Sequence, residues 1–368
     1  MSRTVLAAAL VMTTIACADP STVTSPDAAG PPAFAAGGPC TAAQGQQFID
    51  AGDYKKAIQE FTCVIGQDPT AVEGYRGRIE AQLMLGEFSD ALRDYTRVTA
   101  LVEPVYPDVM QTIVTGYQAR LAATPNAVTA LTGLSFAYWY GFNYPAAMHV
   151  LDDLLLVHPN DVYGNLFRGS SRVLQGTKRA EGAADLEQAI ALAPTSPDVR
   201  FIVADAYTYG SLPDAQRAFD EATFALNGGL NTARVRAIRG ASYLAFGNPA
   251  AAAVEIKTHL DLVTTELVAT APLAVGSFMN LGLVPGRVYD IPITAAQGQL
   301  LSIATSSKDY WDTILVLLAP DGTPVVGSDD YKGYFAGLDW VAPAAGTYHL
   351  RVAFFEAVNT GELLVALK

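Results

Sequence analysis

A pattern that recurs about every 34 residues constrains the fold of this chain more than any other feature. Its clearest copy is "AGDYKKAIQEFTCVIGQDPT" (residues 51–70), and "LGEFSDALRDYTRVTALVEP" (85–104) keeps the glycine, the aromatic residues and the alanine in the same order. Weaker copies occur at 140–161 and 246–262. A unit of this length is a pair of helices that buries its apolar face only by stacking on its neighbours. Residues 40–267 are therefore predicted to form an α-helical solenoid.

Each copy carries the residue types that a helical hairpin needs. A glycine stands at the turn, where a positive φ costs it least. An alanine lets the two helices approach, and a large residue four positions later fills the seam. The turn glycines are Gly52, Gly86, Gly141 and Gly247, the alanines are Ala57, Ala91, Ala147 and Ala252, and the large residues are Phe61, Tyr95, Leu151 and Ile256. This set resembles the tetratricopeptide repeat (TPR) family, which implies stacked antiparallel helix pairs with a concave binding face.

Two less regular units are expected at about 162–195 and 196–230. Residues 106–126 look like the second half of a repeat whose first helix has shrunk, because "YQARLAATPN" ends as the other units do.

From residue 268 to residue 368 the pattern changes to short alternating strands separated by Gly, Pro and Asp, which is typical of an antiparallel β-sandwich. The strands are predicted at 273–286, 287–294, 299–307, 312–320, 323–329, 337–344, 346–355 and 361–368. The succession "YDIPITAAQGQLLSI", "DTILVLLAPDG", "GSDD" and "AGTYHLRV" resembles the bacterial pre-peptidase C-terminal domain. That resemblance implies a jelly-roll-like module and, for the whole chain, an α + β multidomain protein.

The first 16 residues are predicted to be a signal peptide, because Arg3 precedes the short apolar run "TVLAAALVMTTIA". The segment that ends at Cys17 resembles the lipobox of bacterial lipoproteins. Ile15 and Ala16 fit that pattern, whereas Thr14 departs from it. The resemblance implies export to the cell envelope, on the periplasmic or surface side, with a lipid on Cys17. The alternative is a plain secretory cleavage site within "TIACA".

Residues 17–39 are rich in Pro, Ala and Gly and are predicted to be a flexible tether, because they cannot bury enough apolar surface to offset their ordering entropy. The two remaining cysteines, Cys40 and Cys63, would lie at adjoining ends of antiparallel helices. In an oxidising compartment they are expected to pair. Two buried free thiols are the alternative.

The sequence contains no GxSxG, HExxH, GKS, GKT or CxxC pattern, and its four histidines are read as packing or surface residues. We therefore expect no enzyme and no cofactor. A formal net charge of −13 without a Lys or Arg cluster argues against a nucleic-acid partner. No apolar segment of the solenoid or the sandwich is a convincing transmembrane helix.

The inner face of the solenoid is the first candidate site, since aromatic and guanidinium side chains together suit an extended peptide or a planar ligand. The predicted groove residues are Phe136, Trp139, Phe167, Tyr207, Arg76, Arg200 and Arg234. The alternative is that the aromatic residues are ordinary inter-repeat core.

Carboxylates in the turns of the sandwich are the second candidate, because hard oxygen ligands could converge there on Ca²⁺. The candidates are Asp309, Asp312, Asp329 and Asp330, with Asp321 in a further turn. Asp also favours turns for its own backbone hydrogen bonds, which is the alternative explanation.

The sequence thus predicts a non-catalytic, exported scaffold, anchored through a lipid, that binds a protein or peptide partner with its TPR array. Two alternatives remain at this point. The sandwich could be the functional end, in an adhesion or a matrix- or polysaccharide-binding protein, or the chain could be an accessory subunit of an exported hydrolase.

Overall fold

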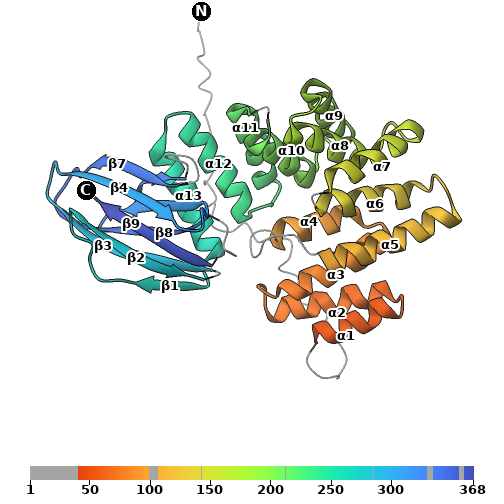
Figure 1. Cartoon of the computed structure of the whole chain (residues 1–368), viewed down its shortest axis with the longest axis horizontal. Helices are drawn as coiled ribbons and strands as arrows, with labels where there is room; N and C mark the ends of the chain where they lie inside the picture. The colour runs from red at the N-terminus through yellow and green to blue at the C-terminus, as the bar shows by residue number, and fades with distance from the viewer. Residues whose placement is uncertain are drawn as a thin grey trace, which may run out of the picture.

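The computed structural model describes residues 40–98, 107–141, 143–211, 213–284, 286–329, 335–355 and 360–368. Within these residues the chain forms thirteen helices and then nine strands (Figure 1). The helices are α1 (Ala42–Asp50), α2 (Tyr54–Gln67), α3 (Val72–Leu85), α4 (Phe88–Val98), α5 (Pro107–Ala123), α6 (Val128–Tyr140), α7 (Tyr144–Val157), α8 (Val162–Gln175), α9 (Arg179–Leu192), α10 (Pro197–Tyr209), α11 (Ala215–Asn227), α12 (Ala233–Ala245) and α13 (Pro249–Val263). Among the described residues, no helix is both long and apolar enough to cross a membrane.

Six helix pairs follow one another as the period predicts: α1–α2, α3–α4, α6–α7, α8–α9, α10–α11 and α12–α13. The four predicted alanines are completely buried in these pairs. Three of the predicted turn glycines, Gly52, Gly86 and Gly247, have φ values of +73°, +80° and +69°. The expectation of a positive φ is wrong for Gly141, whose φ is −79°. Its N–H bonds the Ala137 carbonyl as in a continuing helix, so this turn needs no left-handed residue.

Helix α5 has no partner of its own and packs on α6 and α3. Two of its side chains reach the end of α3. The Tyr117 hydroxyl donates a hydrogen bond to the Leu83 carbonyl, and Arg120 Nη1 donates to the Met84 carbonyl at 2.9 Å. Carbonyls at a helix end have no partner within the helix. The single helix therefore completes the hydrogen bonding of the preceding repeat.

A three-way polar clamp recurs along the array. In the clearest case, Arg78 donates two hydrogen bonds of 2.7 Å to Asp94 of its own repeat and one of 3.0 Å to Thr62 of the preceding repeat. The partners stand 16 residues before and 16 or 17 residues after the arginine in each copy. The other copies are Arg168 with Asp152 and Asp185, and Arg239 with Thr223 and Glu255. Each clamp joins three helices from two repeats.

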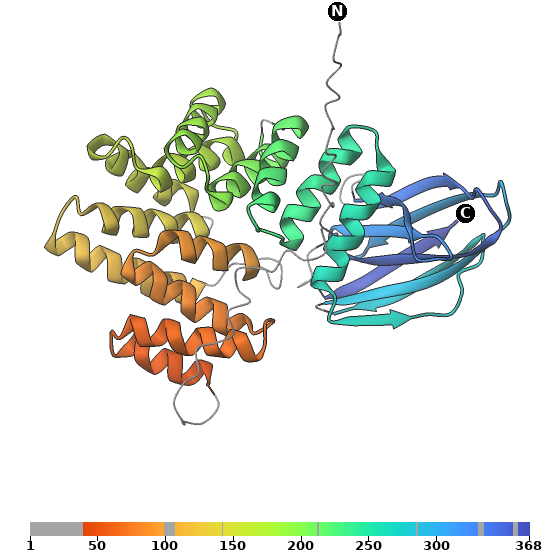
Figure 2. The same ribbon diagram turned by 180° about the vertical axis from the view of Figure 1, so that it is seen from behind.

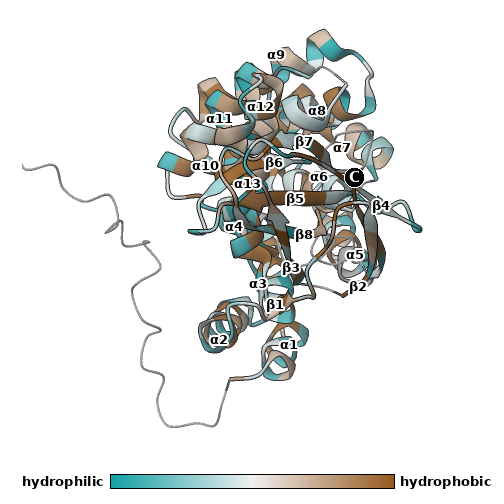
Figure 3. Ribbon diagram, turned by 90° about the vertical axis from the view of Figure 1, so that its left-hand side faces the viewer, coloured by the Kyte–Doolittle hydropathy of each residue, from teal (hydrophilic) through white to brown (hydrophobic). Residues whose placement is uncertain are grey.

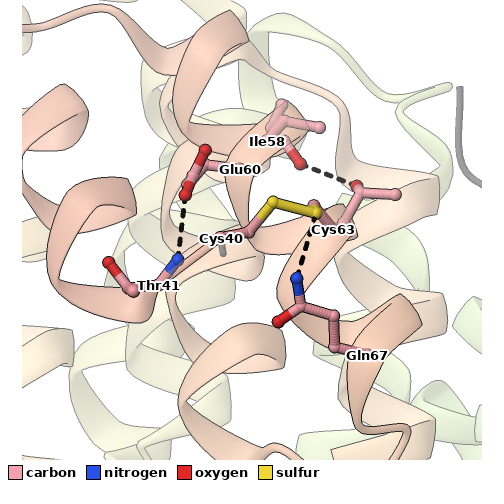
Figure 4. Close-up of a disulfide and its surroundings, with 7 residues drawn as sticks. Cys40, Thr41, Ile58, Glu60, Cys63 and Gln67 are labelled. Carbon is pink, nitrogen blue, oxygen red and sulfur yellow. Dashed lines mark hydrogen bonds between the residues drawn. A yellow bond between two sulfur atoms is a disulfide. The ribbon is translucent and has the colours of Figure 1, made fainter. Parts of the chain in front are cut away.

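The N-terminal repeat is closed by a disulfide between Cys40 and Cys63 (Figure 4). Beside it, the Thr41 N–H donates to Glu60 Oε1 at 2.9 Å, which holds the start of α1 against α2. A cross-link over 23 residues stabilises a fold by about 3 kcal/mol in the chain-entropy model. The first repeat has a neighbour on one side only, so this bond stabilises the end of the array that would otherwise open most easily.

The C-terminal part is a sandwich of two sheets, with strand orders β1-β3-β8-β5-β6 and β2-β9-β4-β7. The strands are β1 (Glu266–Ala269), β2 (Ser277–Leu283), β3 (Arg287–Ala295), β4 (Leu300–Ser307), β5 (Thr313–Leu318), β6 (Pro324–Ser328), β7 (Gly337–Val341), β8 (Gly346–Phe354) and β9 (Gly361–Leu367). All neighbouring strands are antiparallel except β1 and β3. The sequence prediction missed β1, a strand of four residues that is mostly exposed.

Strand β5 is mostly hydrophobic (Figure 3), and every residue in it is buried because the strand is covered on both faces. Leu315 and Leu317 point into the sandwich core, while Ile314 and Val316 point outward against the last helix pair. Helix α13 lies along the outer face of this five-stranded sheet (Figures 1 and 2). The array and the sandwich therefore share one apolar core.

The closest approach in this shared core is at Gly327 of β6. A Cβ atom there would lie 2.9 Å from Ile256 Cδ1 and 3.1 Å from the Ala253 Cα of α13. Backbone cannot move aside as a flexible side chain does. Glycine on the strand and alanine on the helix thus set the distance between the two halves of the molecule.

We expect Gly327→Val to destabilise the protein by about 1–3 kcal/mol, because the added atoms overpack the contact between helix and sheet. Urea unfolding measures this change. Gly282→Val in β2 is the matched control, since no atom lies within 4 Å of a Cβ at that position. Equal stability of the two variants would contradict the described contact.

Candidate functional site

The structure corrects the predicted aromatic groove. Phe136, Trp139, Phe167 and Tyr207 are 1%, 6%, 0% and 7% exposed, so they cannot line an open surface. Phe136 and Trp139 of α6 stack on Phe167 of α8, with ring centroids 4.9 Å and 4.8 Å apart. The Trp139 indole N–H donates to Ser170 Oγ at 2.8 Å. These residues form inter-repeat core, which is the alternative that the sequence left open.

Helix α4 covers this part of the concave face. It is the second helix of its pair and lies near the middle of the curved array (Figures 1 and 2). The Phe88 ring meets Tyr163 of α8 edge-on at 5.6 Å. The Tyr95 ring meets Trp139 and Tyr140 of α6 at 5.7 Å and 4.6 Å. The groove expected between the repeats is therefore filled by the chain itself.

Polar contacts continue this covering onto α10. Ser89 Oγ donates to Asp198 Oδ2 at 3.4 Å, and Arg93 Nη2 lies 3.9 Å from the same oxygen. Burial raises the pKa of Asp198 above its usual value, and the Arg93 guanidinium opposes that shift. Helix α4 thus touches α6, α8 and α10, three successive first helices.

The three predicted arginines lie on three separate helices and make different contacts. Arg76 pairs with Glu73, one turn earlier on α3, at 2.7 Å. Arg200 pairs with the buried carboxylate of Glu221 at 2.8 Å. The Arg200 pair therefore joins α10 to α11, whereas the Arg76 pair lies within α3.

The third arginine, Arg234, lies at the junction between the array and the sandwich. Its Nε donates to Asp205 of α10 at 2.9 Å, and its guanidinium stands 4.0 Å from the ring centroid of Tyr209. On its other side the guanidinium is 5.8 Å from the ring of Phe355, the residue that follows β8. Tyr209 keeps 41% of its surface exposed. We call Tyr209, Arg234 and Asp205 the junction site.

A buried histidine, His259, packs beside the junction site. The His259 ring of α13 stacks on Phe355 at 5.2 Å, and its two nitrogens lie 2.9 Å and 3.2 Å from the carbonyl oxygens of Ala233 and Phe355. Burial lowers the pKa of His259, and the two carbonyl contacts oppose that shift, because the neutral ring has one N–H and can donate to only one of the two oxygens. His259 therefore joins the start of α12 to the end of β8 and fixes the residues beside Arg234.

Two of the predicted calcium ligands belong to this same end of the molecule. The carboxylates of Asp312 and Asp329 are close enough to Tyr209 to raise the pKa of its hydroxyl, although burial is the larger cause and Arg234 opposes it. Asp330 lies outside the described residues. Asp321 is in another turn, where it accepts the Thr323 N–H at 2.9 Å, as the turn alternative predicts.

Within the described residues, no group of three or more His, Cys, Asp or Glu side chains could hold a metal ion. Asp309 instead lies over the backbone of Gly361, with its Oδ2 2.7 Å from where a Cβ would stand. The described carboxylates therefore do not form a ligand set for the predicted calcium ion.

Sequence reasoning missed Tyr209, Asp205 and the supporting His259. Tyr209 ends its helix directly before Gly210, and His259 is one of several polar residues on α13. Nothing in the repeat pattern shows that these positions face the sandwich, since only the packing of α12 and α13 on the sheet brings them there.

A scan against models of known protein families finds no match, and a search of curated proteins finds no relative. Among solved structures, the pre-peptidase C-terminal domain of a collagenase from Bacillus anthracis is 14% identical over 27% of this chain and 95% of that domain, with a TM-score of 0.25. A tetratricopeptide repeat protein from Parabacteroides merdae is 19% identical over 60% of this chain and 91% of its own, with a TM-score of 0.35. A thermophilic TPR protein from Thermus thermophilus is 24% identical over 55% and 97%, with a TM-score of 0.33.

The described helices form successive antiparallel pairs and the strands form a two-sheet sandwich, which is the architecture that the repeat and strand patterns predict. The function has to be argued from the residues of this chain.

We expect Trp139→Ala to destabilise the protein by about 3–5 kcal/mol, because it removes a buried ring from a stack of three and leaves the Ser170 hydroxyl without its donor. Thermal or urea unfolding measures the loss. Trp311→Ala is the control, since Trp311 is 37% exposed. A Trp139→Ala protein as stable as the control would mean that Trp139 is not core.

Proposed function

We propose that the protein is an exported, non-catalytic scaffold, attached to a membrane by a lipid on Cys17, that binds a protein or peptide partner at the junction site. The observation that carries this proposal is the Tyr209 side chain, which is 41% exposed although its hydroxyl end is buried, with the Arg234 guanidinium 4.0 Å from the ring centroid. Tyr and Arg are the residue types most enriched among the strongest contributors to protein interfaces.

The surroundings of the pair make it a suitable binding surface. The ion pair with Asp205 and the contact with Phe355 fix the guanidinium, so little rotamer entropy remains to be lost on binding. The side chains of Arg234 and Asp205 are 27% and 25% exposed, so a partner can reach both charges. A partner that places an apolar side chain on the Tyr209 ring and a carboxylate near Arg234 fits this chemistry.

The lipid anchor is supported by the sequence that ends at Cys17, which lies outside the described residues. The described residues begin at Cys40, so residues 17–39 would lie between them and the membrane. With the other two cysteines joined to each other, a lipid on Cys17 accounts for the third.

The anchor predicts that the protein fractionates with membranes and that Cys17→Ser moves it to the soluble exported fraction, because the mature N-terminus then carries no acyl chain. Fractionation and mass spectrometry of the N-terminal peptide measure this. The control is the pair of changes Cys40→Ser and Cys63→Ser, which removes the disulfide and leaves the anchor. An unmodified mature N-terminus elsewhere would contradict the anchor.

Partner binding is tested by photocrosslinking in the cells that make the protein, with Tyr209→benzoylphenylalanine. We expect a discrete adduct with one partner, and we expect Arg234→Glu to reduce it by about tenfold or more, because the inverted charge repels the partner's carboxylate. The yield of the adduct on denaturing gels is the measurement.

The matched control is Phe246→benzoylphenylalanine, since Phe246 is 43% exposed and follows α12 on the helical array. Equal adducts from both positions, or an adduct at 209 that Arg234→Glu leaves unchanged, would contradict the junction site.

A further inference from the structure

Three aromatic side chains lie together on loops at one end of the sandwich: Tyr310, Trp311 and Phe335. Tyr310 is 76% exposed and Trp311 is 37% exposed. The rings of Tyr310 and Phe335 are stacked, with an interplanar angle of 27° and centroids 6.4 Å apart, so Phe335 supports the exposed Tyr310 ring. We call these three residues the aromatic platform.

The backbone of Tyr310 is strained. Its φ is +59°, a left-handed conformation that costs a residue with a Cβ about 1 kcal/mol or more. A ring that is 76% exposed recovers little of this by burial. A strained position that stability does not explain is a candidate for function.

Trp311 and Asp309 are held side by side over Gly361, the first residue of β9. A Cβ on Gly361 would lie 3.3 Å from Trp311 Cδ1 and 2.7 Å from Asp309 Oδ2, so both side chains rest against this glycine. The Asp309 N–H also donates to Ser307 Oγ at 3.3 Å. An indole ring and a carboxylate are therefore fixed next to each other before any ligand arrives, which lowers the entropy lost on binding.

We propose that the aromatic platform is a binding site for a neutral glycan. A pyranose ring has an apolar face of C–H groups that packs flat on an aromatic ring, and hydroxyl groups around its rim that donate hydrogen bonds. The rings of Tyr310 and Trp311 meet the first requirement. The carboxylate of Asp309, a charged acceptor that makes strong hydrogen bonds, meets the second.

The charged residues beside the aromatic platform disfavour anionic ligands. Of the three charged residues beside the two exposed rings, Lys308 is positive and Asp309 and Asp312 are negative, and the chain has a net charge of −13, so acidic sugars and anionic lipids are disfavoured. Insertion into a bilayer would also desolvate these carboxylates at a high cost. A platform of three side chains is smaller than a standard protein interface but comparable to two or three sugar units.

The test uses the full chain carrying Cys17→Ser, so that no lipid interferes. The probes are the tetrasaccharides of β-1,4-linked glucose and N-acetylglucosamine, with oligogalacturonate and phosphatidylcholine vesicles alongside. We expect saturation-transfer NMR signals and a shift of tryptophan emission with at least one neutral tetrasaccharide, and neither with oligogalacturonate or vesicles. Trp139 is buried but Trp340 of β7 is partly exposed, so the loss of the emission change in Trp311→Ala assigns it to Trp311.

Three variants locate the site. We expect Tyr310→Ala and Trp311→Ala to weaken binding by about tenfold or more, as loss of a stacked ring does. Phe278→Ala is the matched control, because Phe278 is 66% exposed on β2 and lies outside the platform, and it is expected to leave affinity within about twofold.

Tyr310→Gly separates binding from folding. It removes the ring and the strain together, so we expect binding to fall while the melting temperature stays equal or rises. If neither neutral tetrasaccharide gives a signal at about 10 mM, the Kd is too high for a specific binding site, and the proposal is wrong. An equal loss from Phe278→Ala, or binding to vesicles or oligogalacturonate instead, would also overturn it. None of these outcomes depends on the junction site, so the two proposals fail or succeed separately.

Discussion

The packing of α13 on the outer face of the five-stranded sheet is the contact on which the rest of this structure depends. It buries Ile256 and Leu260 of the helix against Ile314 and Val316 of β5, and it closes to backbone distance at Gly327. A helical array exposes the apolar face of its last repeat, and a sandwich with an apolar outer face needs a cover. In this chain the last helix pair covers the apolar outer face of the sheet, and the sheet covers the apolar face of that helix pair. The sandwich therefore acts as the terminal cap of the array.

This shared core also creates the surfaces to which we assign function. Tyr209 and Arg234 come from the array, whereas Phe355 beside them comes from the sandwich. The loop that carries the aromatic platform continues into Asp312, whose carbonyl accepts the Phe355 N–H at 3.0 Å. The junction site and the platform thus lie along one connected backbone. A partner protein and a glycan could be held near each other on the same exported body.

The local elements were predictable from the sequence, while their arrangement was not. Alanines such as Ala57 and Ala252 mark the helix pairs because close approach within a hairpin is a property of neighbouring residues. Phe136 and Trp139 are core because they stack on Phe167 of α8, and Tyr95 of α4 also meets Trp139; the repeat period does not encode these contacts between helix pairs. Tyr209 was missed for the same reason, since its exposure follows from where the sandwich sits. Strand β1 was missed because four mostly exposed residues carry no alternation.

The position of α4 changes how such an array must fold. In a simple stack every contact is between neighbours, so folding can start anywhere and the ends can open independently. Here Ser89 contacts Asp198, which is 109 residues later in the sequence. The ring contacts of Phe88 and Tyr95 form only when α6 and α8 are already in place. Contacts between distant parts of a chain slow folding, because a long loop must close before they form. We therefore expect repeats two to five to fold as one cooperative unit, and to fold more slowly than a simple stack of repeats would.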